Sequence, residues 1–248
     1  MNALSITGML SGMSASRLRE TLGGAEQAAA WIRILAHEGM PEAQVSYGRM
    51  LLQGTVFPKN GHDALQWFRR AASQGNLDAF NMVGRCLENG WGCGVDLSLA
   101  AAYYHRAADA GHAWAQYNLG HMHLDGSGVE RDRAKAYVCY WRAAAQGHAR
   151  AMNLLGRCCE EGWGTPRDLA AAQSWYRRSA EDGYFRGQYN WASILLKSDF
   201  AAQAAAWFER AARLGPPAIR EAVLRVADLP SSPPPMVELA VRLRTCTQ

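Results

Sequence analysis

The chain has 248 residues with a formal net charge of +4, and 49% of them are hydrophobic against 19% charged. This composition can supply a packed core, and so mild a positive charge does not by itself indicate a nucleic-acid partner. No apolar run reaches the roughly 18 residues that a membrane span needs, and the N-terminal segment has no basic residue before Arg17, which makes it a poor secretory signal. We therefore expect a cytoplasmic protein that does not enter a membrane.

The N-terminal part, residues 1–39, predicts a cap made of helices. Segments 14–22 and 25–38 have the apolar spacing of two short helices. We expect this pair to cover the first unit of the repeated region that follows.

A glycine then recurs along the chain with almost constant spacing. Its positions are Gly39, Gly75, Gly111, Gly147, Gly183 and Gly215, separated by 36, 36, 36, 36 and 32 residues. A fixed period of this length is typical of a solenoid. Alanine stands eleven and three residues before each of these reference glycines, and mostly aromatic residues stand eight and seven before it. This spacing places them on one face of a helix. The glycine is predicted to end that helix by adopting a positive φ. Asn60, Asp96, Asp132 and Asp168, fifteen residues before their glycines, are the predicted N-caps.

A second helix is predicted after each reference glycine. Small residues stand four and nine positions after it, and further glycines at 54, 90, 126 and 162 are the predicted helix ends. Small residues let packed helices approach closely. Each unit is therefore expected to be an antiparallel helix pair that buries its apolar faces against its neighbours.

The string AQYNLGHMHLDGSGVERDRAKAYVCYWRAAAQG, residues 115–147, resembles the Sel1-like repeat, a relative of the tetratricopeptide repeat. The resemblance extends over about 40–215 and implies an all-α fold, an α-α superhelix of about five helix-pair repeats with capping helices at both ends. The expected repeats are 40–75, 76–111, 112–147, 148–183 and 184–215, and the last departs from the pattern because Ala192 replaces a glycine.

The C-terminal part, 216–248, contains a predicted helix at 216–228, a proline-rich break PSSPPP at 230–235 and a final apolar helix. This last helix either caps the solenoid or docks on a partner or in the chain's own groove.

Sequence motifs for catalysis are absent, so we expect no enzyme activity and no cofactor. His121 and His123 are two residues apart on a helix and do not share a metal easily. His123 is instead predicted to be a hydrogen-bonded core residue. Most of the six cysteines are expected to be buried and free, because their spacing fits neither a disulfide framework nor a metal site.

Two other recurrent features have a structural and a binding interpretation. Arginines stand five residues before the later reference glycines. Their positive charge there either stabilises the helix C-terminus through the helix dipole or forms a basic stripe for binding. Trp91 and Trp163, in the loops between repeats, either fill the gap between units or contact a partner. The arginines are Arg70, Arg106, Arg142, Arg178 and Arg210.

A binding surface is expected where the first helix of each pair lines the concave groove of the solenoid. Residues three, six and ten positions after the reference glycines are predicted to point into it. Those selected as partner-binding are Arg49, Asn81, Arg85, Trp114, Tyr117, His121, Arg150, Asn153, Arg157, Arg186 and Tyr189.

Arginines with aromatic neighbours suit a protein or peptide that carries acidic groups or a C-terminal carboxylate. The recurrent asparagines either bond to such a peptide or connect adjacent repeats. We therefore expect a monomeric, non-enzymatic scaffold or adaptor for protein interaction. A helical-repeat RNA-binding protein and a hydrolase on the same scaffold are the alternatives, although nucleic acid is not expected as a partner.

Overall fold

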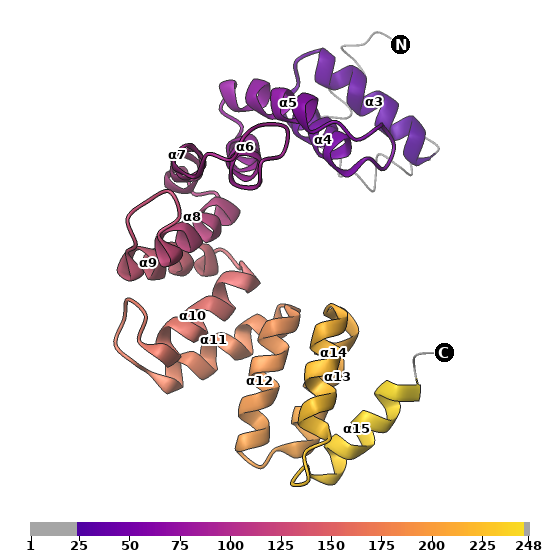
Figure 1. Ribbon diagram of the computed structural model, residues 1–248, viewed down its shortest axis with the longest axis vertical. Coiled ribbons are helices and arrows are strands. Elements are labelled where there is room, and N and C mark those ends of the chain that lie inside the picture. The colour runs from indigo at the N-terminus through magenta and orange to yellow at the C-terminus, as the bar shows by residue number, and fades with distance from the viewer. Residues whose placement is uncertain (1–23, 246–248) are drawn as a thin grey trace. The chain divides into compact units, whose positions relative to one another are not determined.

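The computed structural model describes residues 24–245, and all the regular secondary structure in that range is helical. The predicted all-α class is confirmed (Figure 1). The chain divides into two units, which are described separately below. Unit 1 comprises the described residues up to 115 with 127–129, and unit 2 comprises 116–126 with the described residues from 130 on. The expected N-terminal helix at 14–22 lies outside the described residues.

Unit 1 begins with the helix expected at 25–38. Its helices are α3 (Ala25–His37), α4 (Pro41–Gln53), α5 (Gly61–Ser73), α6 (Leu77–Asn89) and α7 (Leu97–Asp109). Each helix packs on the next along the chain, as antiparallel pairs require. The helix α8 (Ala113–Asp125) starts in unit 1 and continues in unit 2.

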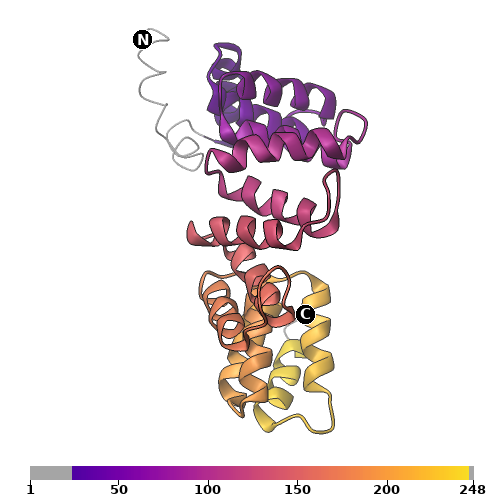
Figure 2. The same ribbon diagram turned by 90° about the vertical axis from the view of Figure 1, so that its left-hand side faces the viewer.

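Unit 2 continues the same pattern, and Figure 2 shows its successive helices lying side by side. Its helices after α8 are α9 (Arg133–Ala145), α10 (Ala149–Glu161), α11 (Leu169–Glu181), α12 (Phe185–Lys197), α13 (Ala201–Leu214), α14 (Pro217–Ala227) and α15 (Pro234–Thr245).

Side-chain caps start the second helix of most pairs, as the sequence predicts. The side-chain oxygen of Asn60 accepts a hydrogen bond from the N–H of Asp63 at 3.0 Å. Asp96, Asp132 and Asp168 cap α7, α9 and α11 in the same way, at 2.9, 3.0 and 2.9 Å. Each cap satisfies a backbone N–H that the helix itself leaves without a partner.

The reference glycines end these helices as expected, with one exception. From Gly39 to Gly183 their φ values lie between 82° and 97°. Gly215 has a φ of −85°, so the predicted left-handed conformation is wrong there. Two prolines follow it directly, and the next helix starts at Pro217, so the chain leaves α13 in an extended conformation.

The glycines nine residues after the reference position make room for an aromatic ring of the paired helix. A Cβ atom added at Gly84 would lie 2.7 Å from Cε1 of Tyr104, and one added at Gly156 would lie 2.6 Å from Cε1 of Tyr176. Phe68 and Tyr140 fill the same space in their own pairs. At each of these sites an aromatic ring therefore packs against the helix backbone. The small residues in the sequence predicted only that the two helices approach closely.

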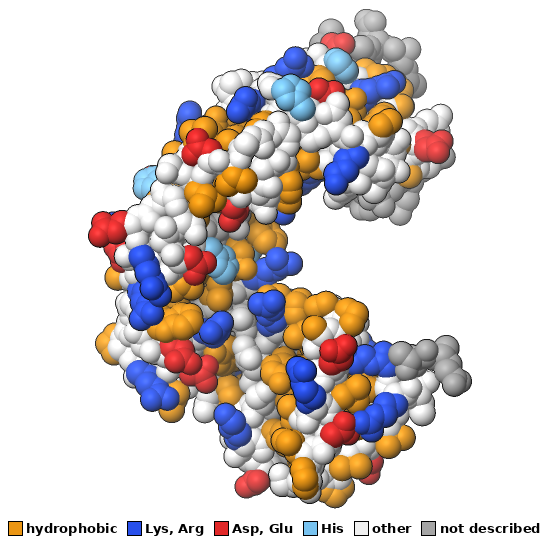
Figure 3. All heavy atoms as spheres, in the orientation of Figure 1, with side chains coloured by type: hydrophobic (Ala, Val, Ile, Leu, Met, Phe, Trp, Pro, Cys, Tyr) orange, Lys and Arg blue, Asp and Glu red, His pale blue; other side chains and the backbone are white. Residues whose placement is uncertain are grey.

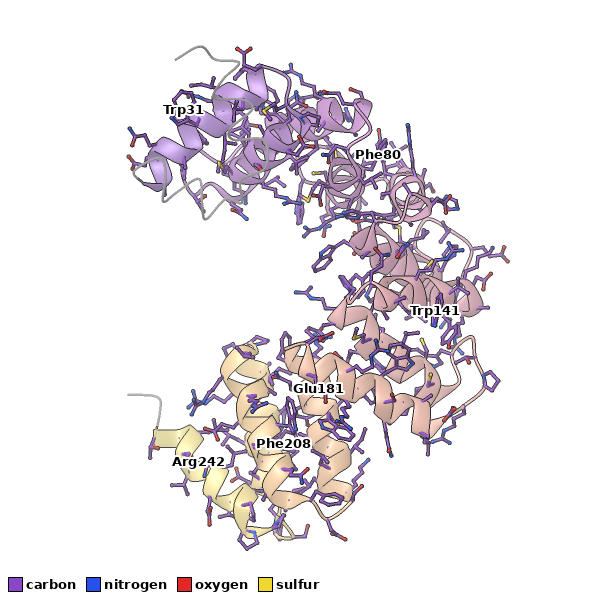
Figure 4. The ribbon with its side chains drawn as sticks, turned by 180° about the vertical axis from the view of Figure 1, so that it is seen from behind. Trp31, Phe80, Trp141, Glu181, Phe208 and Arg242 are labelled. Atoms are coloured by element: carbon purple, nitrogen blue, oxygen red, sulfur yellow. The ribbon has the colours of Figure 1, made fainter. Side chains whose placement is uncertain are left out.

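The C-terminal helix α15 packs on α13 and α14. Met236 and Leu239 of α15 are fully buried in the same core cluster as Phe208 of α13. Figure 4 labels Phe208 on α13 and Arg242 on α15. Arg242 of α15 also lies 3.2 Å from a carboxylate oxygen of Glu209. Of the two interpretations of this segment, the structure places it in the capping position.

Candidate functional site

Four of the predicted binding residues lie together in unit 1, around one cavity of about 920 Å³. The helices α4 and α6 provide most of its wall, and the loop between α4 and α5, the start of α5, the loop after α6 and the first turn of α8 complete it. Its lining residues are Arg49, Leu52, Gln53, Lys59, Gly61, Asp78, Asn81, Met82, Arg85, Gly90, Trp91, Gly92 and Trp114. We call this the unit 1 cavity.

Close loop packing gives the cavity one of its edges. Gly92 has a φ of 77°, and its Cα lies so close to the carbonyl group of Gly61 that a side chain there would collide with backbone. This contact ties the loop after α6 to the start of α5. It holds Trp91, which is next in the chain, at the cavity wall.

One carboxylate in the cavity already has two partners. Asp78 lies 3.2 Å from the Arg49 guanidinium and 3.2 Å from Nε2 of His112. The Nδ1 atom of His112 accepts a hydrogen bond from the N–H of Ala115 at 3.1 Å, so the proton is on Nε2 and is donated to Asp78. This hydrogen bond, together with the charge of Arg49, holds the pKa of Asp78 below its usual value even though burial acts in the opposite direction. Arg49 is therefore engaged within the protein.

Two other cations in the cavity have no carboxylate partner among residues 24–245. The Arg85 guanidinium lies over the ring of Trp91, 5.1 Å from the centroid, and donates to the Met82 sulfur at 3.8 Å. Lys59 is exposed and forms no ion pair in the described part of the chain. Trp114 is 44% exposed beside them. The cavity thus combines cationic and aromatic groups that are accessible to a partner.

The asparagines of the predicted set are buried rather than displayed on a surface. Asn81 is 5% exposed and Asn153 is 4% exposed. The side-chain oxygen of Asn153 accepts a hydrogen bond from Asn190, thirty-seven residues along the chain, at 2.8 Å. For Asn153, the structure supports the interpretation in which asparagines connect adjacent repeats.

Several predicted residues of unit 2 gather around Tyr117. Its ring centroid is 4.7 Å from that of His121 and 4.8 Å from that of His148. Burial raises the pKa of Tyr117, while the positive charges of Arg150 and Arg186 act in the opposite direction. Tyr117, His121, Arg150 and Arg186 therefore form a second group of predicted residues in contact or close by.

The remaining two residues of the set have structural contacts. Arg157 lies over Trp163 with 4.9 Å to the ring centroid, which repeats the pair of Arg85 and Trp91. Tyr189 packs against the core of unit 2 and contacts the ring of Phe208 at 5.2 Å. Core packing thus occupies much of the Tyr189 side chain.

The arginines that stand five residues before the reference glycines lie over aromatic rings. Arg70, Arg178 and Arg210 each lie over the tryptophan three residues earlier, at 4.5, 4.6 and 4.6 Å. Arg106 instead lies over Phe80 of α6, at 4.3 Å. These contacts were not predicted from the sequence, although the recurring tryptophan one helical turn before the arginine was the available signal.

Histidine and cysteine side chains show no metal centre in the range 24–245. Cys86, Cys158 and Cys159 are buried with free thiols as expected, Cys139 is buried as well, and Cys246 lies outside the described residues. Burial raises the pKa of the Cys86 thiol to about 12, so it stays protonated at neutral pH.

One expectation about a histidine is wrong. Nδ1 of His123 is buried without a hydrogen-bond partner, whereas the sequence predicted a hydrogen-bonded core residue. The helical spacing gives the face on which a side chain lies and does not provide its partner.

No helix within the described residues is long and apolar enough to cross a bilayer.

A family model described as Sel1 repeat matches the chain five times, at residues 41–76, 78–112, 115–148, 149–184 and 186–216. These matches cover most of the sequence and follow the period of the reference glycines. No match is found among curated proteins.

Solved structures with a similar fold include two at or above 25% identity. A Sel1 repeat protein from Oxalobacter formigenes is 27% identical with a TM-score of 0.74, and the match covers 87% of this chain and 90% of that protein. The protein c5321, a protective antigen of uropathogenic Escherichia coli strains with an SLR fold, is 25% identical with a TM-score of 0.70 over 93% of this chain. The match covers 51% of c5321, so this chain spans about half of its length.

The immunity protein Pa5087 from Pseudomonas aeruginosa is similar in fold alone. It is 15% identical with a TM-score of 0.56, and the match covers 83% of this chain and 80% of that protein.

Proposed function

The chain belongs to the Sel1 repeat family, whose members are typically non-catalytic scaffolds for protein interaction, and from this premise we propose that its unit 1 cavity binds a peptide segment that carries carboxylate groups. The observation that supports the proposal best is the presence of accessible cations beside aromatic rings in one cavity. Arg85 and Lys59 supply the positive charge, and Trp114 supplies an exposed apolar surface.

The orientation of Arg85 suits this role. Its guanidinium lies over Trp91, and this contact restricts the side chain before a ligand arrives. A guanidinium binds a carboxylate through two parallel hydrogen bonds, and a restricted side chain loses less entropy on binding. Arg85 is therefore the proposed anchor for a side-chain or C-terminal carboxylate.

The ion pair between Asp78 and Arg49 affects which charge the cavity accepts. Because Asp78 is held by Arg49 and His112, its negative charge is largely balanced. A carboxylate placed at Arg85 consequently meets less repulsion than the sequence alone implies.

A matched pair of substitutions tests the proposal. Arg85→Gln and Arg106→Gln each remove one positive charge and one cation–aromatic contact from unit 1, but only Arg85 lines the cavity. Binding to an array of acidic peptides is measured with free and with amidated C-termini. We expect Arg85→Gln to weaken binding by about tenfold or more and Arg106→Gln to leave it unchanged.

Three results contradict the proposal: equal loss in both variants, binding that survives in Arg85→Gln, or no bound peptide at all. The amidated series distinguishes a terminal carboxylate from acidic side chains. Titration with single-stranded RNA tests the nucleic-acid alternative, since such binding falls steeply with salt. On the face seen in Figure 3, basic and acidic side chains alternate, which does not favour a polyanion.

A further inference from the structure

The solvent-facing side of α9 in unit 2 carries an apolar stripe. Ala134, Val138, Trp141 and Ala145 are all exposed and are spaced by four, three and four residues, so they lie along one face of the helix. Trp141 is 52% exposed and Val138 is 45% exposed. Figure 4 shows Trp141 on α9, and we call these four residues the α9 stripe.

The fold does not require this stripe, because the equivalent positions of the other second helices are mostly polar. In α11, Arg177 and Glu181 occupy the positions of Trp141 and Ala145, and they form an ion pair at 2.8 Å. Relative to the reference glycine, the residues equivalent to Trp141 are Arg69, His105, Arg177 and Glu209, and those equivalent to Ala145 are Ser73, Asp109, Glu181 and Arg213.

The packing of α9 within unit 2 uses its opposite face. Ala136, Tyr140, Ala143 and Ala144 of α9 are fully buried in the core cluster that α9 shares with α10. The ring of Trp141 makes no aromatic contact with another ring in the described structure. A large apolar side chain that is half exposed and that the repeat does not require marks an interaction surface.

The charges around the stripe indicate what kind of partner fits. The helix α9 contains Arg133, Lys135 and Arg142 and no acidic residue. Lys135 follows Ala134 and Arg142 follows Trp141, so both lie about 100° around the helix on one side of the stripe. Arg133 precedes Ala134 and lies on the other side. Basic groups therefore flank the apolar stripe on both sides, although Lys135 also lies 3.4 Å from the capping Asp132.

This charge distribution argues against two α9 helices facing each other. A second copy would bring three basic residues opposite three more, at a cost from like-charge repulsion. A partner with acidic residues beside an apolar face has complementary charge instead.

The shape of the stripe also fits a helix. The two alanines at its ends leave the helix backbone accessible to a close neighbour, and Trp141 projects between them as one large side chain. Lipid insertion has less support, because Trp141 and Val138 are the only large apolar residues of the stripe and membrane binding scales with buried apolar area.

We propose that the α9 stripe binds an amphipathic α-helix of another protein, with an apolar face that contacts Trp141 and acidic residues that flank it. This surface is separate from the unit 1 cavity, and the proposal does not depend on the function of that cavity.

Labelled synthetic helices test the proposal with the full-length chain. One peptide has leucines at i, i+3, i+4 and i+7 flanked by glutamates, and its control has the same leucines flanked by lysines. Binding is followed by fluorescence anisotropy. We expect the acidic peptide to bind and the basic peptide to bind at least about tenfold more weakly.

The variants Trp141→Arg and Val138→Ser introduce the residues that α11 carries at the same positions, Arg177 and Ser174, so both are expected to fold. Each should weaken binding of the acidic peptide, Trp141→Arg by about tenfold or more. Arg177→Ala on α11 should leave it unchanged, and thermal melting confirms that each variant is folded.

Other outcomes overturn the proposal. They are the absence of binding, equal binding by wild type and Trp141→Arg, or a dimer seen by sedimentation that Trp141→Arg abolishes. Binding to phosphatidylserine vesicles that depends on Trp141 would assign the stripe to a membrane surface instead.

Discussion

The helix pairs α8–α9 and α10–α11 of unit 2 have the same backbone plan but different polar contacts. In both, a glycine of the first helix accommodates a tyrosine ring of the second: Gly120 with Tyr140, and Gly156 with Tyr176. The hydroxyl of Tyr176 donates to the Glu160 carboxylate at 2.7 Å, whereas the hydroxyl of Tyr140 is buried without a partner.

The reason lies in one residue of the first helix. Leu124 occupies the position in α8 that Glu160 occupies in α10. In unit 1, the pair α6–α7 follows the pattern of α10–α11, since Tyr104 donates to Glu88 at 2.6 Å. The ring packing is thus shared by successive repeats, and the hydrogen bond is an addition that alternate repeats carry.

Unfolding at alkaline pH tests the burial of the tyrosine ring that the helix pairs share, and it has the largest expected effect. Burial raises the pKa of Tyr104, Tyr140 and Tyr176 above the ordinary value of 10.0. Since the folded pKa is raised, the stabilising contribution of each neutral phenol is complete below pH 10 and is lost as the pH rises above it. Each tyrosine should cost about 1.4 kcal/mol of unfolding free energy per pH unit, about 4 kcal/mol for the three together.

Chemical denaturation between pH 9 and 12 measures this slope. Tyr140→Phe is the suitable control, because it removes a titrating group without removing a hydrogen bond, and it should reduce the slope by about a third. A slope that does not change in this variant would mean that Tyr140 ionises in the folded protein.

Filling the glycine sites tests the shared packing directly. A Cβ atom at Gly120 or Gly156 would lie 2.6 Å from Cε1 of the stacked tyrosine. Gly120→Val and Gly156→Val should therefore each lower the free energy of unfolding by about 3 kcal/mol. Thermal and urea unfolding measure the loss, and Ser174→Val on the exposed side of α11 should change it by no more than about 0.5 kcal/mol. Unequal losses at the two glycines would show that the pairs do not share the contact.

Much of this architecture can be predicted from spacing along the sequence. Asp132 and Asp168 cap their helices as expected, because a cap bonds only to its own neighbours in the chain. Predictions that depend on contacts between elements were less complete. The partner of Asn153 is in another repeat, and the partner that His123 lacks would also have to come from elsewhere in the fold.

The candidate site shows the same division. Periodicity predicted that Arg49, Asn81, Arg85 and Trp114 lie on the first helices, and all four line the unit 1 cavity. The sequence did not indicate that Asp78 neutralises Arg49 while Arg85 lies over a tryptophan, because those pairings depend on three-dimensional contacts. Lys59 was also missed, since it lies in a loop outside the helical periodicity.

Removing the two hydroxyls tests the part that differs between the pairs. Tyr176→Phe loses a hydrogen bond to a carboxylate and should destabilise the protein by about 1.5 kcal/mol. Tyr140→Phe removes a buried hydroxyl that has no partner and should stabilise it by about 1 kcal/mol. Urea unfolding at pH 7 measures both. If both variants lose stability equally, the Tyr140 hydroxyl has a hydrogen bond in solution, to water for example, and the contrast between the repeats disappears.

The arginines of the second helices provide the finest test of the same contrast. Arg178 lies over Trp175 at 4.6 Å, whereas Arg142 follows Cys139 at the equivalent spacing and has no ring there. At exposed sites such a contact contributes about 0.5–1 kcal/mol, so Arg178→Ala should cost that amount and Arg142→Ala should cost less than about 0.3 kcal/mol. A double-mutant cycle with Trp175→Ala separates the contact from the favourable effect of any cation near a helix C-terminus, which both arginines share. A coupling energy near zero for Arg178 and Trp175 would mean that the helix dipole alone accounts for the arginine at this position in every repeat.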